Sequence, residues 1–363
     1  MKLQFLNPLY APADPVASVY LDTSRDIDDP DRAIERRWRH LRESLLAHDA
    51  GEATVDAVES VLGTDREIAG PHGQAVFAAA GRLLLTEYLP DPPVRDSACF
   101  GALPDALPLV LQHAPDLPYA AVAIRRVHLP EAAGGGEVLD IEYDIGHWPM
   151  GRVNAATPGW RTPVDSWPQQ AEQFLAELAG AAESGGTEEI LLAGDPWAAN
   201  TMIRLAPNWL KNRLVRLKNG HHHYPQPGRA VLEDELEAVF TDRLPQRDRQ
   251  QLDAFQAQRA RDPEACEGLT AAVAALQRGQ ARTVLINRPV QQTPPLWVGG
   301  APTDLARSAD DLRAFGIDYY WEQDAGSAVT RAAAGTQAEL VVVPREELPF
   351  PDGIAVLLRR SVD

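Results

Sequence analysis

Residues 188–196 are the stretch that most constrains how this chain can fold. Their apolar run, residues 190–193, is short and bounded by charged and turn-forming residues, which predicts a buried strand. Helical patterns are predicted on both sides, at about 164–182 and 197–214, and a second strand follows at 214–217. Alternating helices and strands in this order indicate an α/β layer.

Gly194, Asp195 and Pro196 follow the buried strand directly. Ligands of open α/β sheets bind beyond the carboxyl ends of the strands, so these three residues are a candidate site. The alternative is a tight turn in which Asp195 caps the next helix. The turn chemistry that Gly, Asp and Pro share favours this second interpretation.

The overall composition excludes several classes of protein. Of the 363 residues, 45% are hydrophobic, which is enough for well-packed cores, and no apolar run approaches the ~20 residues of a membrane span. The N-terminus lacks the apolar region of a signal peptide, and Cys99 and Cys266 have no metal-type neighbours, so we expect a reduced, cytoplasmic protein without metal or cofactor. The net charge of −18 argues against nucleic-acid binding by the overall field but allows a local basic face.

Arginine is concentrated in a helix predicted at 29–47, which follows a strand predicted at 16–22. Its apolar residues recur at helical spacing, at Ile34, Trp38, Leu41 and Leu45. The other face carries five arginines: Arg32, Arg36, Arg37, Arg39 and Arg42. A solvated face is the usual explanation for such a run, and contact with RNA phosphates is the alternative.

The central part of the chain begins with two predicted strands, 120–124 and 138–143, joined by a glycine-rich turn. The segment 146–168 then shows little periodicity, and a loop of this length is more often functional than idle. It contains three tryptophans, which suggests that it is pinned down or docks something large. The adjacent histidines 221–223 do not have the spacing of a helix-face metal site.

The last part of the chain alternates helices and strands. Strands are predicted at 283–287, 339–343 and 353–359, and helices at 230–244, 247–261, 269–277, 304–315 and 327–334. Gly279 is expected to end the helix at 269–277. An additional helix at 52–62 and a hairpin of strands 75–79 and 83–88 are predicted near the N-terminus.

Three stretches near the C-terminus carry a family resemblance: 279–286 (GQARTVLI), 335–343 (GTQAELVVV) and 352–359 (DGIAVLLR). They resemble the C-terminal domain of archaeal and eukaryotic class-1 peptide-chain release factors and Pelota. Residues 190–194 and their neighbouring elements resemble the middle domain of that family. More narrowly, the chain resembles a bacterial branch found in actinobacteria and related to the hibernation factor Balon.

The resemblance implies an α/β protein of three domains. Residues 1–117 would form an N-terminal release-factor-like α/β domain. Residues 118–225 would form an RNase H-like middle domain. Residues 226–363 would form an α/β/α sandwich resembling kink-turn-binding ribosomal proteins. Linkers are expected near 116–117 and 225–228.

Release factors of this family carry Gly-Gly-Gln in the middle domain, where the glutamine positions a water against the peptidyl-tRNA ester. The matching segment, 144–167, has no such motif. A similar tripeptide, His72-Gly73-Gln74, precedes a strand in the first domain, and we interpret Gln74 as a strand-edge residue. Peptide release by the family mechanism is therefore not expected, and His147 is the candidate base that remains in the segment.

The resemblance implies a ribosome-binding factor that occupies the aminoacyl-tRNA site of idle 70S ribosomes and protects them. Ribosomal RNA is an expected partner, elongation factor Tu is a candidate partner, and no membrane is expected. The arginines of helix 29–47 would contact ribosomal RNA phosphates. The residues expected near the peptidyl-transferase centre are His147, Trp148, Arg152, Trp160 and Arg161. Further cations allow a locally basic face, namely Arg204, Lys211, Arg213, Arg216 and Lys218.

Two alternatives stay open. The chain could be a peptidyl-tRNA or aminoacyl-ester hydrolase, or a ribosome-rescue factor, in which His147 replaces the missing catalytic group. It could also be a stress-induced α/β protein without an RNA partner.

Overall fold

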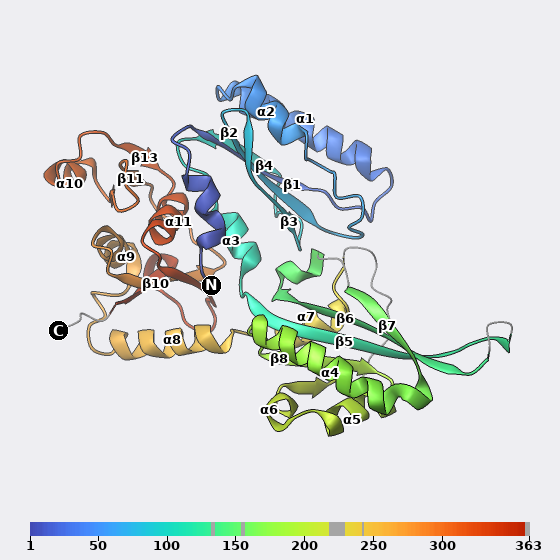
Figure 1. Cartoon of the computed structure of the whole chain (residues 1–363). Helices are drawn as coiled ribbons and strands as arrows, with labels where there is room; N and C mark the ends of the chain where they lie inside the picture. Colours follow the sequence, from blue (N-terminus) through green and yellow to red (C-terminus); the bar gives the residue numbers. More distant parts are fainter. Residues whose placement is uncertain (132–134, 154–156, 218–228, 242, 360–363) are drawn as a thin grey trace. The chain divides into compact units, whose positions relative to one another are not determined.

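The computed structural model describes residues 1–131, 135–153, 157–217, 229–241 and 243–359. The chain divides into two compact units. The first unit comprises Met1–Asp65, Pro71–Pro115 and Gln246–Asp363, and the second comprises Arg66–Gly70 and Asp116–Pro245. Several sheets with helices against them confirm the predicted mixed α/β class (Figure 1). The division into three domains stays a prediction, and its second linker lies outside the described residues.

The N-terminal part of the first unit is an antiparallel sheet with the strand order β3-β2-β1-β4. Its strands are β1 (Val16–Asp22), β2 (Gly73–Ala79), β3 (Arg82–Leu89) and β4 (Ser97–Gly101). Helices α1 (Pro30–Ala47) and α2 (Glu52–Glu59) pack on one face of it (Figure 1). The predicted apolar face of α1 is confirmed, since its four residues are all at most 6% exposed.

The C-terminal part of the first unit is built on a sheet of strand order β14-β10-β15. Strand β10 (Ala281–Arg288) pairs parallel to β14 (Glu339–Pro344) and antiparallel to β15 (Ile354–Leu358). The helices and 3-10 helix of this region are α3 (Leu107–His113), α8 (Gln246–Arg259), α9 (Gly268–Gln277), α11 (Ala325–Gly335) and η1 (Gln4–Tyr10). Gly279 ends the last turn of α9 with φ +61°, as predicted.

The helix predicted at 304–315 is wrong in its first part. Leu305–Ala306 is strand β12, which pairs with β11 (Leu296–Val298), and β11 also pairs with β13 (Trp321–Gln323). Only α10 (Ala309–Ala314) is helical, because Ser308 caps it by accepting a hydrogen bond from the Asp311 amide. An apolar pair such as Leu305 and Ala306 is too short to show strand periodicity in the sequence.

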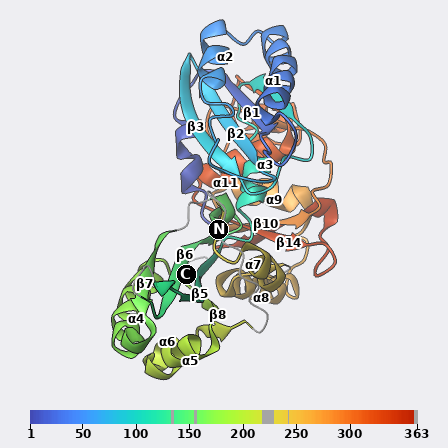
Figure 2. The same cartoon turned by 90° about the vertical axis from the view of Figure 1, so that its right-hand side faces the viewer.

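The second unit contains a five-stranded sheet of order β7-β6-β5-β8-β9. Its strands are β5 (Leu117–His128), β6 (Glu137–Trp148), β7 (Thr157–Pro163), β8 (Glu189–Gly194) and β9 (Leu214–Arg216). Helices α4 (Trp167–Ser184), α5 (Pro196–Leu205) and α6 (Asn208–Lys211) lie on one face (Figures 1 and 2). Helix α7 (Glu233–Phe240) covers the other face. Alternate residues of β5 and β8 therefore enter two different cores, as a strand buried on both faces requires.

Two predicted helices of the second unit are shorter in the structure. The helix expected at 197–214 is two helices, because Ala206 is extended before Pro207 and proline disfavours a helical conformation in the preceding residue. The helix expected at 230–244 is confined to α7, which Thr241 ends in an extended conformation. In the described ranges, no helix combines the length and apolar character that crossing a membrane requires.

The turn after β8 confirms the cap interpretation. Gly194 has φ +98°, and a Cβ atom there would lie 1.9 Å from the carbonyl oxygen of Ile124, so only glycine fits. Asp195 Oδ1 accepts a hydrogen bond from the Ala198 amide at 2.8 Å, which caps α5. Arg126 also donates to Asp195, at 2.8 Å, so this carboxylate is engaged in the fold.

Candidate nucleic-acid interface

The arginines of α1 fall into two groups around the helix axis. At about 100° per residue, Arg32, Arg36 and Arg39 lie opposite the buried face, and all three are exposed. Arg39 pairs with Glu35 at 3.1 Å, but both side chains are about two-thirds exposed, at 67% and 69%, so the pair is weak. Within the described part of the chain, Arg32 and Arg36 form no ion pair.

Arg37 and Arg42 flank this stripe and serve the fold. Arg37 Nη2 lies 2.8 Å from an Asp22 carboxylate oxygen, and its Nε lies 3.7 Å from Asp96. Arg42 pairs with Glu59 of α2 at 3.5 Å. We therefore restrict the candidate phosphate contacts of α1 to its outward stripe.

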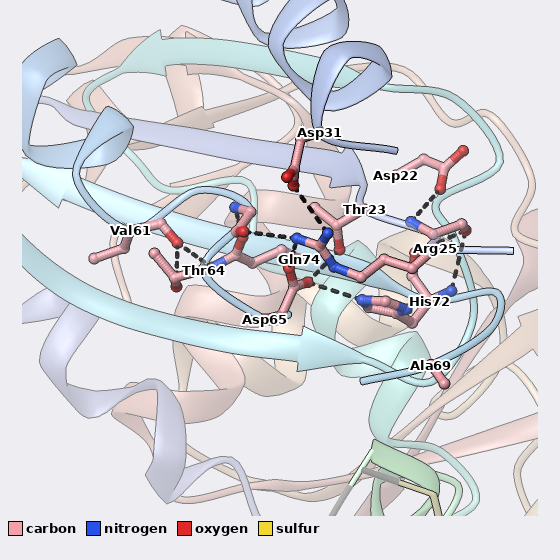
Figure 3. Close-up of polar contacts among 12 residues, drawn as sticks. Asp22, Thr23, Arg25, Asp31, Val61, Thr64, Asp65, Ala69, His72 and Gln74 are labelled. Carbon is pink, nitrogen blue, oxygen red and sulfur yellow. Dashed lines mark hydrogen bonds and ion pairs between the residues drawn. The ribbon is translucent and has the colours of Figure 1, made fainter. Parts of the chain in front are cut away.

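The start of α1 is held by a buried carboxylate, Asp65 (Figure 3). Thr23 Oγ1 donates to Asp65 Oδ2 at 2.6 Å, and His72 Nε2 lies 2.9 Å from the same oxygen. The side chains of Asp65 and His72 are both 0% exposed. These contacts join the end of β1 to the segment that leads into β2.

Arg25 extends this network to the helix. Its Nη2 lies 3.4 Å from Asp65 Oδ1 and donates to the carbonyl of Gly63 at 2.8 Å. Its Nη1 donates to Asp31, in the first turn of α1, at 2.9 Å. Burial would raise the pKa of Asp65, but hydrogen bonds from His72 and Thr23 and the charges of His72 and Arg25 outweigh it, so this pKa is lowered. The loop before α1 is thus pinned on an ionised carboxylate.

Gln74 is part of the same core and not a strand-edge residue, so that prediction is wrong. It lies on β2, an interior strand of its sheet, and is 0% exposed. Its Nε2 donates to the Val61 carbonyl at 2.8 Å, and its Oε1 accepts from the Gly63 amide at 2.9 Å. Its amide therefore satisfies backbone groups of a neighbouring turn, which is a structural role.

The segment 146–168, predicted as a long loop, contains regular structure. It includes the end of β6, the 3-10 helices η3 (Met150–Val153) and η4 (Val164–Ser166), and strand β7. Strand β7 pairs antiparallel with β6. The sequence hides this strand because it contains two prolines and a glycine, which are tolerated since β7 lies at the edge of the sheet.

Trp148 and Arg152, two of the residues predicted to reach the peptidyl-transferase centre, pack on their own unit. Trp148 is 6% exposed, lies near Phe240 and has the Arg152 guanidinium 5.3 Å above its ring. Arg152 Nε donates to Glu233 at 3.0 Å. These contacts fix the turn after β6 to the core side that carries α7.

The remaining predicted residues of this segment differ in exposure. Trp160 is half-buried against Phe174, with ring centroids 5.5 Å apart, whereas its neighbour Arg161 is exposed. The side chain of His147 is 51% exposed, and its Nδ1 lies 2.8 Å from Asp116 Oδ1. The hydrogen bond to Asp116 raises the pKa of His147. His147 and Arg161 are thus the exposed side chains of this set.

The structure assembles no metal site from these groups. In the described ranges, no three His, Cys, Asp or Glu side chains gather as a metal ion would require. The histidines 221–223 and Lys218 lie outside the described residues.

Comparisons with known proteins show what this chain is similar to. Residues 120–261 match the family model described as bacterial archaeo-eukaryotic release factor family 2. Two proteins of Mycobacterium tuberculosis, MT2704 of strain CDC 1551 / Oshkosh and Rv2629 of strain H37Rv, are each 26% identical to this chain over 381 residues. These alignments cover 99% of this chain and 97% of each relative.

Solved structures of archaeal proteins are also similar to this chain. The archaeal translation termination factor aRF1 is 14% identical, covers 96% of this chain and 94% of its own, and gives a TM-score of 0.21. Archaeoglobus fulgidus Pelota is 11% identical, with 99% and 92% covered and a TM-score of 0.33.

The matched residues, 120–261, lie mostly in the second unit. This match agrees with the predicted resemblance to a bacterial branch of the archaeal and eukaryotic release-factor and Pelota family.

Proposed function

We propose that this protein is a ribosome-binding translation factor that occupies the aminoacyl-tRNA site of idle ribosomes and leaves the peptidyl ester intact. The observation that carries the proposal is the family match over 120–261, a segment without Gly-Gly-Gln. A factor of this family that lacks the residue that orients the water keeps the means of binding but not the means of release.

The outward stripe of α1 supplies the ribosomal RNA contact in this proposal. Three exposed guanidinium groups, on Arg32, Arg36 and Arg39, lie along one side of a helix that is anchored at its start by Asp65. Guanidinium groups bind phosphate oxygens in a bidentate manner, and an anchored helix loses little conformational entropy on binding.

Co-sedimentation with purified 70S ribosomes tests the proposal. We expect the wild-type protein to sediment with ribosomes and the triple variant Arg32→Gln, Arg36→Gln, Arg39→Gln to bind more weakly, with a shallower salt dependence. A matched control removes three exposed arginines elsewhere: Arg249→Gln, Arg278→Gln and Arg282→Gln. Equal binding by both triple variants would exclude the stripe. Adding elongation factor Tu to the same assay tests it as a partner.

A hydrolase is the second candidate, and one observation favours it. Asp116 orients the exposed His147 imidazole, as a carboxylate does in a catalytic pair. Ribosomes carrying peptidyl-tRNA distinguish the two functions. Release of peptide by the wild type, abolished in His147→Gln, would support the hydrolase, whereas binding with the ester intact supports the factor proposed above.

A further inference from the structure

A second cationic surface lies in the second unit, at residues 196–217. This segment holds four cations and no acidic residue, although the whole chain carries a charge of −18. Helix α4, the neighbouring helix on the same face of the sheet, has the opposite character, with three glutamates and no cation. The helical layer of this unit is therefore divided into an acidic half and a basic half.

The four cations of this segment are Arg204, Lys211, Arg213 and Arg216. None of them forms an ion pair with any residue that the structure describes. Arg204, Lys211 and Arg216 are exposed, and Arg213 is half-buried and donates to the Thr187 carbonyl at 3.1 Å. No carboxylate among the described residues therefore neutralises these four charges.

Helical spacing and one hydrogen bond place Arg204 and Arg216 on a common side of α5. Trp197 and Arg204 are seven residues apart on α5, so they project within about 20° of each other. Asn200 lies on the same face of α5 and accepts a hydrogen bond from Arg216 of β9 at 3.2 Å. Strand β9 is the edge of its sheet, so this side of α5 continues onto an open edge.

Two tryptophans are exposed on the same segment, each beneath an arginine. Trp209 is 42% exposed, and the Arg213 guanidinium lies 5.6 Å from its ring centroid. Trp197 is 43% exposed, with Arg126 at 5.5 Å. Arg126 is itself neutralised by Asp195 and Glu137, so its contribution is to hold the ring. Stacking holds both rings in place while much of their surface stays open.

We infer that this surface, which we call the α5–β9 surface, binds single-stranded RNA. The α5–β9 surface consists of Trp197, Arg204, Trp209, Lys211, Arg213 and Arg216. Cations without carboxylate partners match phosphates, and ordered tryptophan rings stack on bases, which is the combination that proteins use for single strands. The inference deepens the proposed function and rests on it only in taking the RNA to be ribosomal.

Binding of a fluorescently labelled, unstructured single-stranded RNA of mixed sequence tests this inference. Fluorescence anisotropy at several KCl concentrations compares the wild type with Arg204→Gln, Lys211→Gln. Losing two phosphate contacts lowers the slope of log K against log salt by about 1.4 and weakens binding roughly ten-fold near physiological salt. The control Arg249→Gln, Arg282→Gln removes the same charge from the first unit and leaves binding unchanged.

Trp209 separates stacking from charge. Trp209→Ala is expected to weaken RNA binding roughly ten-fold with the salt slope unchanged, and Trp209→Phe is expected to keep most of the affinity. Rescue by phenylalanine also shows that the alanine variant did not simply unfold.

Ribosome co-sedimentation of the same variants distinguishes the two proposals. The inference fails and the proposed function stands if the wild type binds ribosomes and the double variant Arg204→Gln, Lys211→Gln binds both ribosomes and the free RNA as tightly as the wild type does. If the wild type does not bind ribosomes but binds the single-stranded RNA through these residues, the proposed function fails and the inference stands. Loss of ribosome binding by the double variant with no RNA binding by the wild type would indicate an acidic protein partner and overturn the RNA assignment.

Discussion

Helix α1 and the α5–β9 surface are both rich in cations, but the two regions use them differently. On α1, three of the five arginines have carboxylate partners, at Asp22, Glu35 and Glu59. On the α5–β9 surface, none of the four cations of residues 196–217 pairs with a described residue. A count of arginines in the sequence is therefore a poor guide to a binding surface, and the nearest carboxylates decide which charges are available.

The difference follows from the sequence around each group. Residues 30–47 contain three acidic residues among the five arginines, whereas residues 196–217 contain none. Carboxylates from β1 and α2 also reach α1. We expect α1 to respond to substitution through stability as well as binding, and Arg204 and Lys211 of the α5–β9 surface to respond through binding alone.

The largest effect is expected at Asp65. Asp65→Asn removes the charge on which Arg25 and His72 converge, and breaking such a buried pair costs about 3 kcal/mol of unfolding free energy. Denaturant unfolding measures it, with the exposed Asp28→Asn as the control. The double variant Arg204→Gln, Lys211→Gln should stay within about 0.5 kcal/mol of wild type. A larger loss of unfolding free energy in the double variant than in Asp65→Asn would show that the α5–β9 cations, and not the α1 network, stabilise the fold.

The pH dependence of the same variant follows from the lowered pKa of Asp65. A carboxyl with a depressed folded pKa adds stability above its unfolded pKa of about 3.9, and that stability is lost as the pH falls through the folded value. The unfolding free energies of wild type and Asp65→Asn should thus differ at neutral pH and converge in acid. A constant difference down to low pH would mean that the ionised carboxylate is not what holds the loop.

Arg36 and Arg37 give the next largest effect, and they are adjacent in sequence. Arg37→Gln removes contacts to Asp22 and Asp96 and should cost about 1.5 kcal/mol of unfolding free energy, while ribosome binding by the folded protein persists. Arg36→Gln should leave stability within about 0.5 kcal/mol and weaken ribosome binding. Denaturant unfolding and co-sedimentation of both variants test whether one variant loses stability and the other loses ribosome binding. Equal behaviour of the two variants would remove the division of α1 into two groups.

Much of the fold could be predicted from the sequence because it depends on neighbours in the chain. The apolar spacing of α1, the hairpin of β2 and β3 and the Gly194 turn are all local patterns. Strand β7 was missed because its prolines oppose strand propensity, and only pairing with β6 makes it a strand.

The candidate site could be predicted only in its residue types. Which arginines are committed to the fold depends on partners far away in sequence, such as Asp22 for Arg37, and sequence spacing carries no signal of them. The Asp65 network, with contacts that span up to 42 residues, was missed for the same reason. Conversely, the open cations of residues 196–217 were visible as a stretch without acidic residues.

A smaller effect is expected from replacing Glu35. The replacement leaves Arg39 without a carboxylate partner, like the cations of the α5–β9 surface. Glu35→Gln releases Arg39 from its ion pair and removes a negative charge from the stripe. Exposed pairs of this spacing are worth only about 0.3–0.5 kcal/mol, so we expect roughly two-fold tighter ribosome binding and little change in stability. Co-sedimentation at low salt measures it, against Glu237→Gln on α7 as the control. Weaker binding by Glu35→Gln would show that the carboxylate itself contributes to the contact.

The smallest effect is expected at His147, whose charge depends on pH and which belongs to neither cationic region. Its hydrogen bond to Asp116 raises its pKa, so the pair stabilises the fold below the unfolded histidine value of about 6.5 and loses this effect as the pH rises through the folded value. Because His147 is half-exposed, His147→Gln should cost only about 0.2 kcal/mol even at low pH. Denaturant unfolding of wild type and variant across this pH range measures the difference, which should vanish on the alkaline side. A difference that grows with pH would mean that the neutral imidazole is the form the fold favours.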